Sequence, residues 1–286
     1  MRRWILSLIG AAVWASAGAR TVAPALREAA DEPKEAILVV SFGTSHDDTR
    51  AVTIDALREA VAAEFPGVEV REAYTSNVIR RILRKRGIEK PDPRTALLRL
   101  AADGYDRVAI LSTNLLDGKE TELLRAETEA MRPFFGEIRL SEALLHDLED
   151  CRRLLGVMTR RLESLETRDT HVVLVGHGSP TMANAVYSQL DHLLQSGGFG
   201  RYHVATIEGY PTPETVLARL KEARARRVVL VPLLLVAGDH AKNDIGTEWR
   251  ELFEQEGFRV EVRMEGLGEV PEIRRLYIEH LRHAMQ

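Results

Sequence analysis

Residues 37–45 read ILVVSFGTS, four aliphatic residues followed by a turn that contains a glycine. An apolar run without polar alternation is typical of a strand buried on both faces, as in a parallel sheet. Residues 172–180, VVLVGHGSP, repeat the pattern in the second half of the chain. Another pair of similar segments, residues 104–120 and 225–240, places an arginine just before an apolar run. These repeats predict two related halves.

From residue 36 onward, apolar β-branched runs alternate with amphipathic stretches. Strands are expected at 36–41, 68–73, 107–112, 137–140, 171–176, 202–207, 227–233 and 259–263. Helices are expected at 48–64, 77–86, 94–102, 120–131, 145–165, 182–194, 213–223, 244–256 and 271–283. This alternation predicts an α/β fold of two lobes, each a four-stranded parallel sheet flanked by helices, with a cleft between them. The N-terminal lobe is predicted over residues 36–143 and the C-terminal lobe over residues 144–286.

The first 19 residues have the features of a secretory signal peptide. A positively charged start is followed by an apolar stretch, residues 4–15, that is too short to span a bilayer, and two A-x-A cleavage sites end at Ala17 and Ala19. We therefore expect a mature N-terminus at Gly18 or Arg20, a loose leader segment over residues 20–35, and a periplasmic protein. After cleavage the protein is not expected to be an integral membrane protein. An uncleaved membrane anchor is the alternative.

Composition excludes several classes of protein. The chain has 286 residues, of which 45% are hydrophobic and 29% charged, and its net charge is −4. This acidic balance argues against general nucleic-acid binding, which needs a basic surface. The single cysteine, Cys151, excludes an intrachain disulfide and a cysteine-based zinc site. The sequence also lacks the G-x-S-x-G motif of the serine hydrolases.

Three predicted strands in the second half each end on a side chain that can bind a metal ion. His177 follows the strand at 171–176, Glu208 follows the next strand, and His240 follows the third. Ligands bind beyond the carboxyl ends of parallel strands, so the three side chains are expected at one edge of the sheet. Two imidazoles and a carboxylate suit Co²⁺, Ni²⁺, Fe²⁺ or Zn²⁺. The pattern predicts a metal site built from these three residues.

The first half offers candidate residues for binding an anionic substrate. Hydroxyl groups ahead of the helix at 48–64 could hold a carboxylate or a phosphate. Cations on the helix at 77–86 could attract a polyanion, although such a run is more often a solvated surface. The candidates are Ser41, Thr44, Ser45, Arg80, Arg81 and Arg84. No G-x-x-x-x-G-K-[ST] motif is present, which argues against a nucleotide-binding loop.

Six motifs resemble those of the anaerobic-type sirohydrochlorin cobaltochelatases, the CbiK-type class II tetrapyrrole chelatases. They are SFGTS (41–45), GYDRVAI (104–110), GHGSP (176–180), EGYP (208–211), PLLLVAGDHAKND (232–244) and GLGE (266–269). The resemblance covers residues 36–286. It implies two Rossmann-like lobes with the tetrapyrrole in the cleft, and it assigns the metal ligands to His177, Glu208 and His240. Family members often have a histidine where this chain has Asn114, which leaves haem binding open.

The resemblance implies a lyase that inserts Co²⁺ into sirohydrochlorin during cobalamin biosynthesis, with Fe²⁺ or Ni²⁺ as alternative metals. The tetrapyrrole and the divalent ion are then the partners, and neither ATP nor a redox cofactor is required. His177 and His240 are the candidate catalytic residues, with His240 as the base and Glu208 compensating charge. Two alternatives are an exported haem- or metal-binding carrier with a chelatase fold, and a ferrochelatase acting on protoporphyrin. A homo-oligomer is left open.

Overall fold

The computed structural model describes residues 33–165 and 167–286. Residues 34–286 form one compact unit. The predicted signal peptide and nearly all of the predicted leader, residues 1–32, lie outside the described residues. Among the described residues, no helix is long and apolar enough to cross a membrane.

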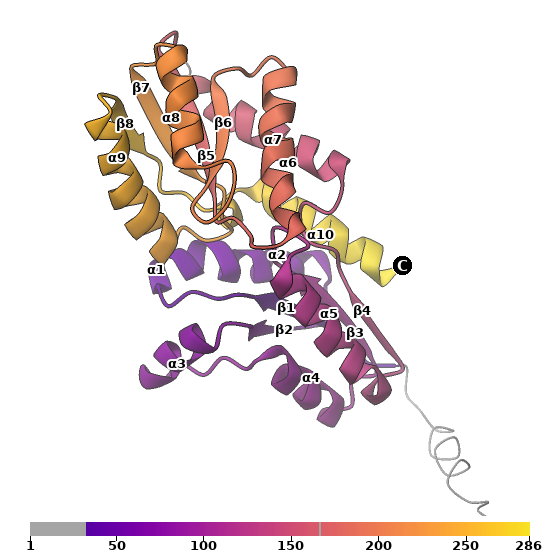
Figure 1. Ribbon diagram of the computed structural model, residues 1–286. Coiled ribbons are helices and arrows are strands. Elements are labelled where there is room, and N and C mark those ends of the chain that lie inside the picture. Colours follow the sequence, from indigo (N-terminus) through magenta and orange to yellow (C-terminus); the bar gives the residue numbers. More distant parts are fainter. Residues whose placement is uncertain (1–32, 166) are drawn as a thin grey trace, which may run out of the picture. The chain divides into compact units, whose positions relative to one another are not determined.

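The described chain contains two four-stranded parallel sheets with the same strand order (Figure 1). The first has the order β2-β1-β3-β4 and consists of β1 (Glu35–Ser41), β2 (Glu69–Tyr74), β3 (Arg107–Ser112) and β4 (Glu137–Leu140). The second has the order β6-β5-β7-β8 and consists of β5 (Thr170–Gly176), β6 (Tyr202–Thr206), β7 (Arg227–Pro232) and β8 (Arg259–Val262). The predicted fold is confirmed, because the two sheets repeat one topology and make β5 and β7 the equivalents of β1 and β3.

Helices cover both faces of each sheet. In the first half they are α1 (Asp47–Arg50), α2 (Ala56–Glu64), α3 (Asn77–Lys85), α4 (Pro93–Ala102) and α5 (Lys119–Met131). In the second half they are α6 (Leu148–Leu162), α7 (Ala185–Ser196), α8 (Pro213–Glu222), α9 (Arg250–Gln255) and α10 (Pro271–Met285). Two segments, Ala51–Asp55 and Ala241–Trp249, are π-helical. Such segments are rare and often occur at functional sites.

The apolar run of β1 is buried on both sides, as its sequence predicts. Ile37 and Val39 face the core shared with α2, whereas Leu38 and Val40 face the core shared with α4 and α5. All four side chains are buried. Since successive strand residues point to opposite faces, only a continuous apolar run can fill both cores.

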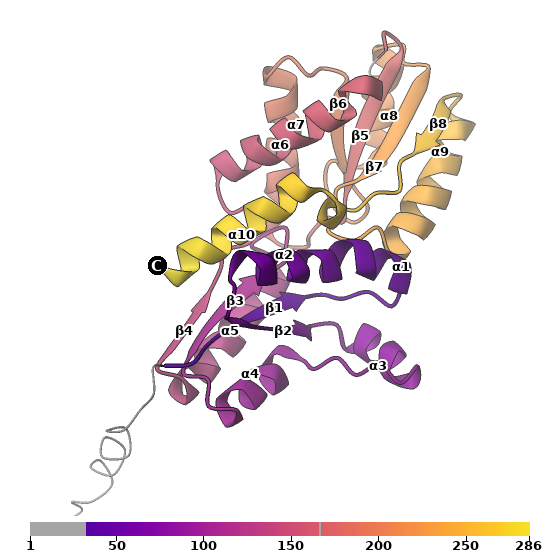
Figure 2. The same cartoon turned by 180° about the vertical axis from the view of Figure 1, so that it is seen from behind.

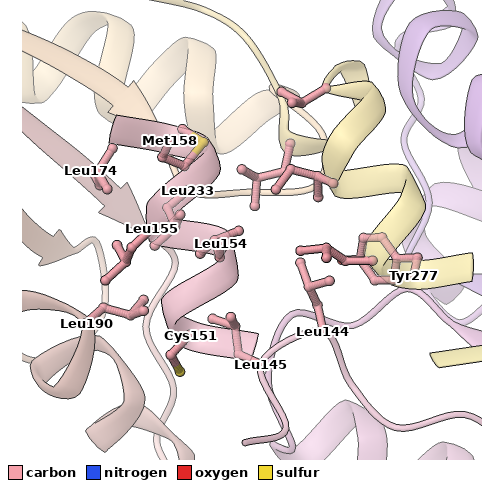
Figure 3. Packing of buried hydrophobic residues seen from close by; sticks show 14 of the residues in the cluster. Leu144, Leu145, Cys151, Leu154, Leu155, Met158, Leu174, Leu190, Leu233 and Tyr277 are labelled. Carbon is pink, nitrogen blue, oxygen red and sulfur yellow. The ribbon is translucent and has the colours of Figure 1, made fainter. Parts of the chain in front are cut away.

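A single core joins the two sheets. It includes Leu154 and Leu174 from the second half together with Tyr277 from α10 (Figure 3). Although α10 ends the chain, it packs against β3 and β4 of the first sheet (Figure 2). The hydroxyl of Tyr277 donates a hydrogen bond to the carbonyl oxygen of Thr113 at 3.0 Å. The predicted lobe boundary between residues 143 and 144 stays a prediction. The helix α10 follows this boundary in the sequence, yet it contacts the first sheet.

The helix predicted from residue 145 begins three residues later, at Leu148. Asp147 is its N-cap, since its carboxylate accepts from the backbone of Asp150 and the Asp150 carboxylate accepts in return. This reciprocal capping stabilises a helix start. Leu144 and Leu145 instead donate backbone hydrogen bonds to the loop after β3 and bury their side chains.

Candidate metal-binding site

The loops after β5 and β7 bring two of the predicted ligands together. The Nε2 atoms of His177 and His240 lie 3.3 Å apart, and the two rings are nearly perpendicular, with centroids separated by 4.5 Å. Nitrogen ligands 2.0–2.1 Å from one tetrahedral ion lie about 3.3–3.4 Å from each other. The two imidazoles are therefore already spaced as ligands of a single first-row ion.

Close packing fixes the loop that carries His177. A Cβ on Gly176 would lie 2.1 Å from the ring of Tyr187, so only glycine fits there. The Tyr187 hydroxyl lies against the backbone of His177 and Gly178, and burial raises the pKa of Tyr187 to about 12. Its hydroxyl stays protonated at physiological pH as a result. The loop that carries His177 is thus held in position by the neutral, buried side chain of Tyr187.

Asp244 orients the ring of His240. The distance from His240 Nδ1 to Asp244 Oδ2 is 2.7 Å, and Asp244 lies in the π-helical segment that begins directly after the histidine. When Nδ1 donates its proton to the carboxylate, Nε2 carries a free lone pair directed at His177. The sequence prediction missed this residue. Because the helix was expected to begin at Asp244, the four-residue spacing to His240 could not be seen as one helix face.

Glu208 lies beside the histidine pair through its backbone. Its N–H donates to the carbonyl oxygen of His177 at 2.8 Å. A Cβ on Gly178, whose φ is +94°, would lie 2.0 Å from the Glu208 carbonyl, so the two loops approach each other only because residue 178 is glycine. The Glu208 side chain is exposed. Among the described residues, its carboxylate does not form a group with the two histidines in which all ligand atoms lie within 4.8 Å.

The first half of the chain contacts this site through side chains that the sequence did not indicate. His46 Nε2, in the loop after β1, lies 2.6 Å from Oδ1 of Asp239, the residue before His240. Lys242 Nζ lies 3.4 Å from Oδ2 of Asp48. His46 and Asp239 thereby link the loops after β1 and β7, and Lys242 and Asp48 link the helical segments that follow these loops.

The loops after β3 and β5 form an equivalent contact. A Cβ on Gly118 would lie 3.5 Å from Ser179 Oγ, in the loop of His177. In the repeated topology β1 corresponds to β5, and β3 corresponds to β7. The contact between the loops after β3 and β5 therefore corresponds to the contact between the loops after β7 and β1, which Asp239 and His46 make. The loops at the carboxyl ends of the two sheets therefore meet in two related places, as expected for ligand-binding edges.

The predicted hydroxyl ligands are mostly engaged within the protein. The Ser41 side chain is buried, and its oxygen lies 3.0 Å from Thr113 Oγ1. Thr44 is also buried, and its Oγ1 accepts from the N–H of His46 at 3.2 Å. Ser45 is half-buried, and its carbonyl oxygen accepts from Arg86 at 2.5 Å.

The cations of α3 differ in their surroundings. Arg80 is largely buried and lies 3.2 Å from Oδ2 of Asp92, whereas Arg81 and Arg84 are exposed. Arg86, the C-cap of α3, pairs with Asp47 and so links α3 to α1. Asn114 Nδ2 donates to Thr121 Oγ1 at 3.0 Å, so the side-chain amide of Asn114 is hydrogen-bonded to another residue of the first half of the chain.

Comparison with known proteins identifies relatives of this chain. The profile of the family described as cobalt chelatase (CbiK) matches residues 35–286. The sirohydrochlorin cobaltochelatase of Salmonella typhimurium is 38% identical over 257 residues, covering 88% of this chain and 97% of the relative. Sirohydrochlorin cobaltochelatase CbiKC of Nitratidesulfovibrio vulgaris is 30% identical over 258 residues, covering 88% and 91%.

Solved structures of chelatases share the fold. SirB from Bacillus subtilis with Fe³⁺ superposes with a TM-score of 0.63 at 17% identity, covering 88% of this chain and 95% of SirB. A cobalt complex of the sirohydrochlorin chelatase SirB from Bacillus subtilis subspecies spizizenii gives 0.62 at 18% identity, with the same coverage of both chains. With a profile match over nearly all described residues and two relatives at 30% identity or more, this chain belongs to the cobalt chelatase (CbiK) family.

Proposed function

We infer that this protein is a metal chelatase that inserts Co²⁺ into sirohydrochlorin. The observation that carries this inference is the pair of imidazole nitrogens, 3.3 Å apart at the ends of β5 and β7, in a chain of this family. Two relatives of nearly full-length coverage are named sirohydrochlorin cobaltochelatases. Fe²⁺ and Ni²⁺ prefer similar ligands and are the alternative metals.

The reaction exchanges protons for a metal ion. Two pyrrole N–H bonds break, two bonds from nitrogen to cobalt form in addition to those from the other ring nitrogens, and two protons leave. No electron is transferred and no phosphate is cleaved, so we propose that neither a redox cofactor nor ATP is required. Haem plays no part in this scheme.

We propose that His177 and His240 hold the incoming ion and leave its remaining positions open to the macrocycle. Glu208 would complete the site by rotation of its exposed side chain, since its backbone already lies next to His177. His240 is also the proposed base. Asp244 would stabilise the imidazolium that forms when His240 accepts a pyrrole proton.

We propose further that the protein acts in the periplasm after removal of a signal peptide. The charged and apolar pattern of residues 1–19 supports this location, as do the two A-x-A sites. Intact mass of protein from a periplasmic fraction should give a chain beginning at Gly18 or Arg20, and full-length protein found in the cytoplasm would contradict export. The same pattern motivates the second candidate function, an exported carrier of haem or metal.

A metallation assay tests the proposed function and separates the two candidates. Purified protein incubated with sirohydrochlorin and Co²⁺ should convert the absorbance spectrum to that of the cobalt complex, whereas a carrier would bind the tetrapyrrole and leave it without metal. His240→Ala should abolish conversion, and His177→Ala should weaken it. His192→Ala, an exposed histidine on α7, is the matched control. Unchanged conversion by the His240→Ala variant would refute the assignment.

A further inference from the structure

A second group of metal-binding side chains lies at the carboxyl edge of the first sheet. Asp117 follows β3, and Glu142 and His146 lie between β4 and α6. His146 Nδ1 is 2.7 Å from Asp117 Oδ2 and 3.5 Å from Glu142 Oε2. In the described part of the chain, this is the one group of three such residues whose ligand atoms all lie within 4.8 Å of one another.

We propose that Asp117, Glu142 and His146 form a second binding site for a divalent first-row ion, which captures the metal substrate before it reaches His177. One imidazole nitrogen and two carboxylate oxygens suit Co²⁺, Fe²⁺ or Zn²⁺. Ligand atoms bonded at 2.0–2.2 Å to one ion are separated by about 3–3.5 Å. The observed distances of 2.7 and 3.5 Å bracket this range. The ligand atoms of Asp117 and Glu142 also lie within 4.8 Å of each other.

The backbone holds the two loops of this site in register. The N–H of Leu144 donates to the carbonyl of Asn114, and the N–H of Leu145 donates to that of Leu115, each at 3.0 Å. Both leucine side chains are buried in the core that joins the two sheets (Figure 3). The α6 capping box at Asp147 fixes the chain directly after His146. The ligand-bearing loops are thus anchored, while the three ligand side chains remain at least partly accessible.

Arg125 is the competing cation. Its Nη2 lies 3.4 Å from Asp117 Oδ1 and 3.6 Å from Glu142 Oε2, and its side chain is 54% exposed. The alternative to a metal site is an ion-pair network that the guanidinium already completes. The two interpretations differ in the affinity of the native chain for the ion. A metal site should bind Co²⁺ with Arg125 in place and more tightly without it, whereas a completed network should bind no Co²⁺ while the arginine is present.

The position of the site connects it to the histidine pair. Gly118, the neighbour of Asp117, approaches Ser179 in the loop that carries His177. The loop that carries Asp117 therefore contacts the loop that carries His177. The capture role rests on the proposed chelatase function, whereas binding of the ion does not.

Ion binding is tested in a His177→Ala/His240→Ala background, which removes the proposed chelatase ligands. Calorimetric titration with Co²⁺ should show one ion per chain, accompanied by the visible absorption of cobalt bound to nitrogen and oxygen. Adding His146→Ala should weaken binding by roughly tenfold or more, and adding Arg125→Met should tighten it. His192→Ala is the control for loss of an exposed histidine, and circular dichroism verifies folding. No binding in the background, or binding indifferent to His146→Ala, overturns the site.

The capture role is tested separately in the otherwise native protein. His146→Ala should raise KM for Co²⁺ in the metallation assay and leave kcat nearly unchanged, because the chemical step occurs elsewhere. An unchanged KM overturns capture. If the native protein fails to metallate sirohydrochlorin, the proposed function fails, and the cobalt titration still reports independently on the second site.

Discussion

The chemistry assigned to His240 depends on which nitrogen carries its proton. A free imidazole can present either nitrogen to a metal, but the Asp244 carboxylate at 2.7 Å favours a proton on Nδ1. The lone pair on Nε2 then points toward His177. Carboxylates that hydrogen-bond a metal-binding histidine fix its tautomer and the orientation of its ring. This arrangement favours a group that holds an ion through Nε2 and accepts a proton at the same atom once the ion has left.

Asp244→Ala should lower cobalt affinity and the rate of metallation by about 10–100-fold, because His240 loses its orienting acceptor. Asp244→Asn should lose less, since the amide oxygen still accepts from Nδ1. Cobalt titration and the metallation assay measure the two effects. Glu248→Ala changes an exposed carboxylate in the same π-helical segment and serves as the control. Equal rates for Asp244→Ala and the wild type would show that Asp244 does not orient His240.

At the scale of elements, the sequence predicts the bounds of the strands almost residue by residue. It does not predict the contacts between the loops that follow the strands. The central strands β1, β3, β5 and β7 are apolar runs with clear ends, so their bounds follow from local pattern. The pairing of His46 with Asp239 joins residues 193 positions apart, and no local pattern contains it. The cluster at Asp117, Glu142 and His146 was also missed, because it requires β3 and β4 to be adjacent and their loops to be hydrogen-bonded.

The exposed cations of α3 should act on substrate capture if they attract the tetrapyrrole carboxylates. Arg81→Glu with Arg84→Glu should raise KM for sirohydrochlorin and leave kcat nearly unchanged, since attraction at a distance aids only association. Added salt should weaken capture by the native protein, because exposed charges are screened beyond roughly 8 Å at physiological ionic strength. Steady-state kinetics at two salt concentrations measure both effects. An unaltered KM would make α3 an ordinary solvated surface.

The adjacent strands β5 and β6 carry a buried pair of histidines that should make the fold sensitive to acid. His171 Nδ1 lies 3.0 Å from His203 Nε2, and both side chains are buried. Burial lowers the pKa of His171 and lowers that of His203 to about 4, with a further decrease at His203 from His171. Arg201 opposes protonation of His171, Arg219 opposes that of His203, and Asp191 favours the latter.

A base whose pKa is lower in the folded state stabilises the fold above its unfolded pKa, near 6.5, and this stability is lost as the pH falls toward 4. We therefore expect the free energy of unfolding to decrease over this range, by on the order of 3 kcal/mol from His203. Urea unfolding of the wild type and of His203→Gln at several pH values measures it. A variant whose unfolding free energy falls as steeply as that of the wild type would exclude His203 as the cause.

In the molecule as a whole, a shared core and a few loop contacts have different roles. The core that includes Leu154, Leu174 and Tyr277 joins the two sheets, and α10 contributes to it from the far end of the chain. The carboxyl edges meet through the polar contacts of His46 and Lys242, and also through Leu235 and Val236, which pack against the apolar cluster that includes Ile54. Between the loops after β3 and β5, by contrast, Gly118 lies against the hydroxyl of Ser179. We expect these two loops to separate at low cost and to admit the macrocycle to the histidine pair.

A covalent link between the loops after β3 and β5 should therefore slow entry of the macrocycle and leave binding of the metal ion unchanged. Gly118 and Ser179 approach closely enough for a disulfide between cysteines introduced at both positions. The φ of Gly118 is −102°, which any residue can adopt. Native Cys151 should not interfere, because it is buried and burial raises its pKa to about 11.

The oxidised Gly118→Cys/Ser179→Cys protein should bind Co²⁺ at the histidine pair as tightly as the wild type. Its metallation of sirohydrochlorin should be slow and should recover when dithiothreitol reduces the disulfide. Ser179→Cys alone controls for loss of the hydroxyl, which lies 3.0 Å from Thr181 Oγ1. If the oxidised protein metallates sirohydrochlorin at the wild-type rate, the macrocycle reaches His177 and His240 without separating these two loops, and entry must instead occur past the contact between His46 and Asp239.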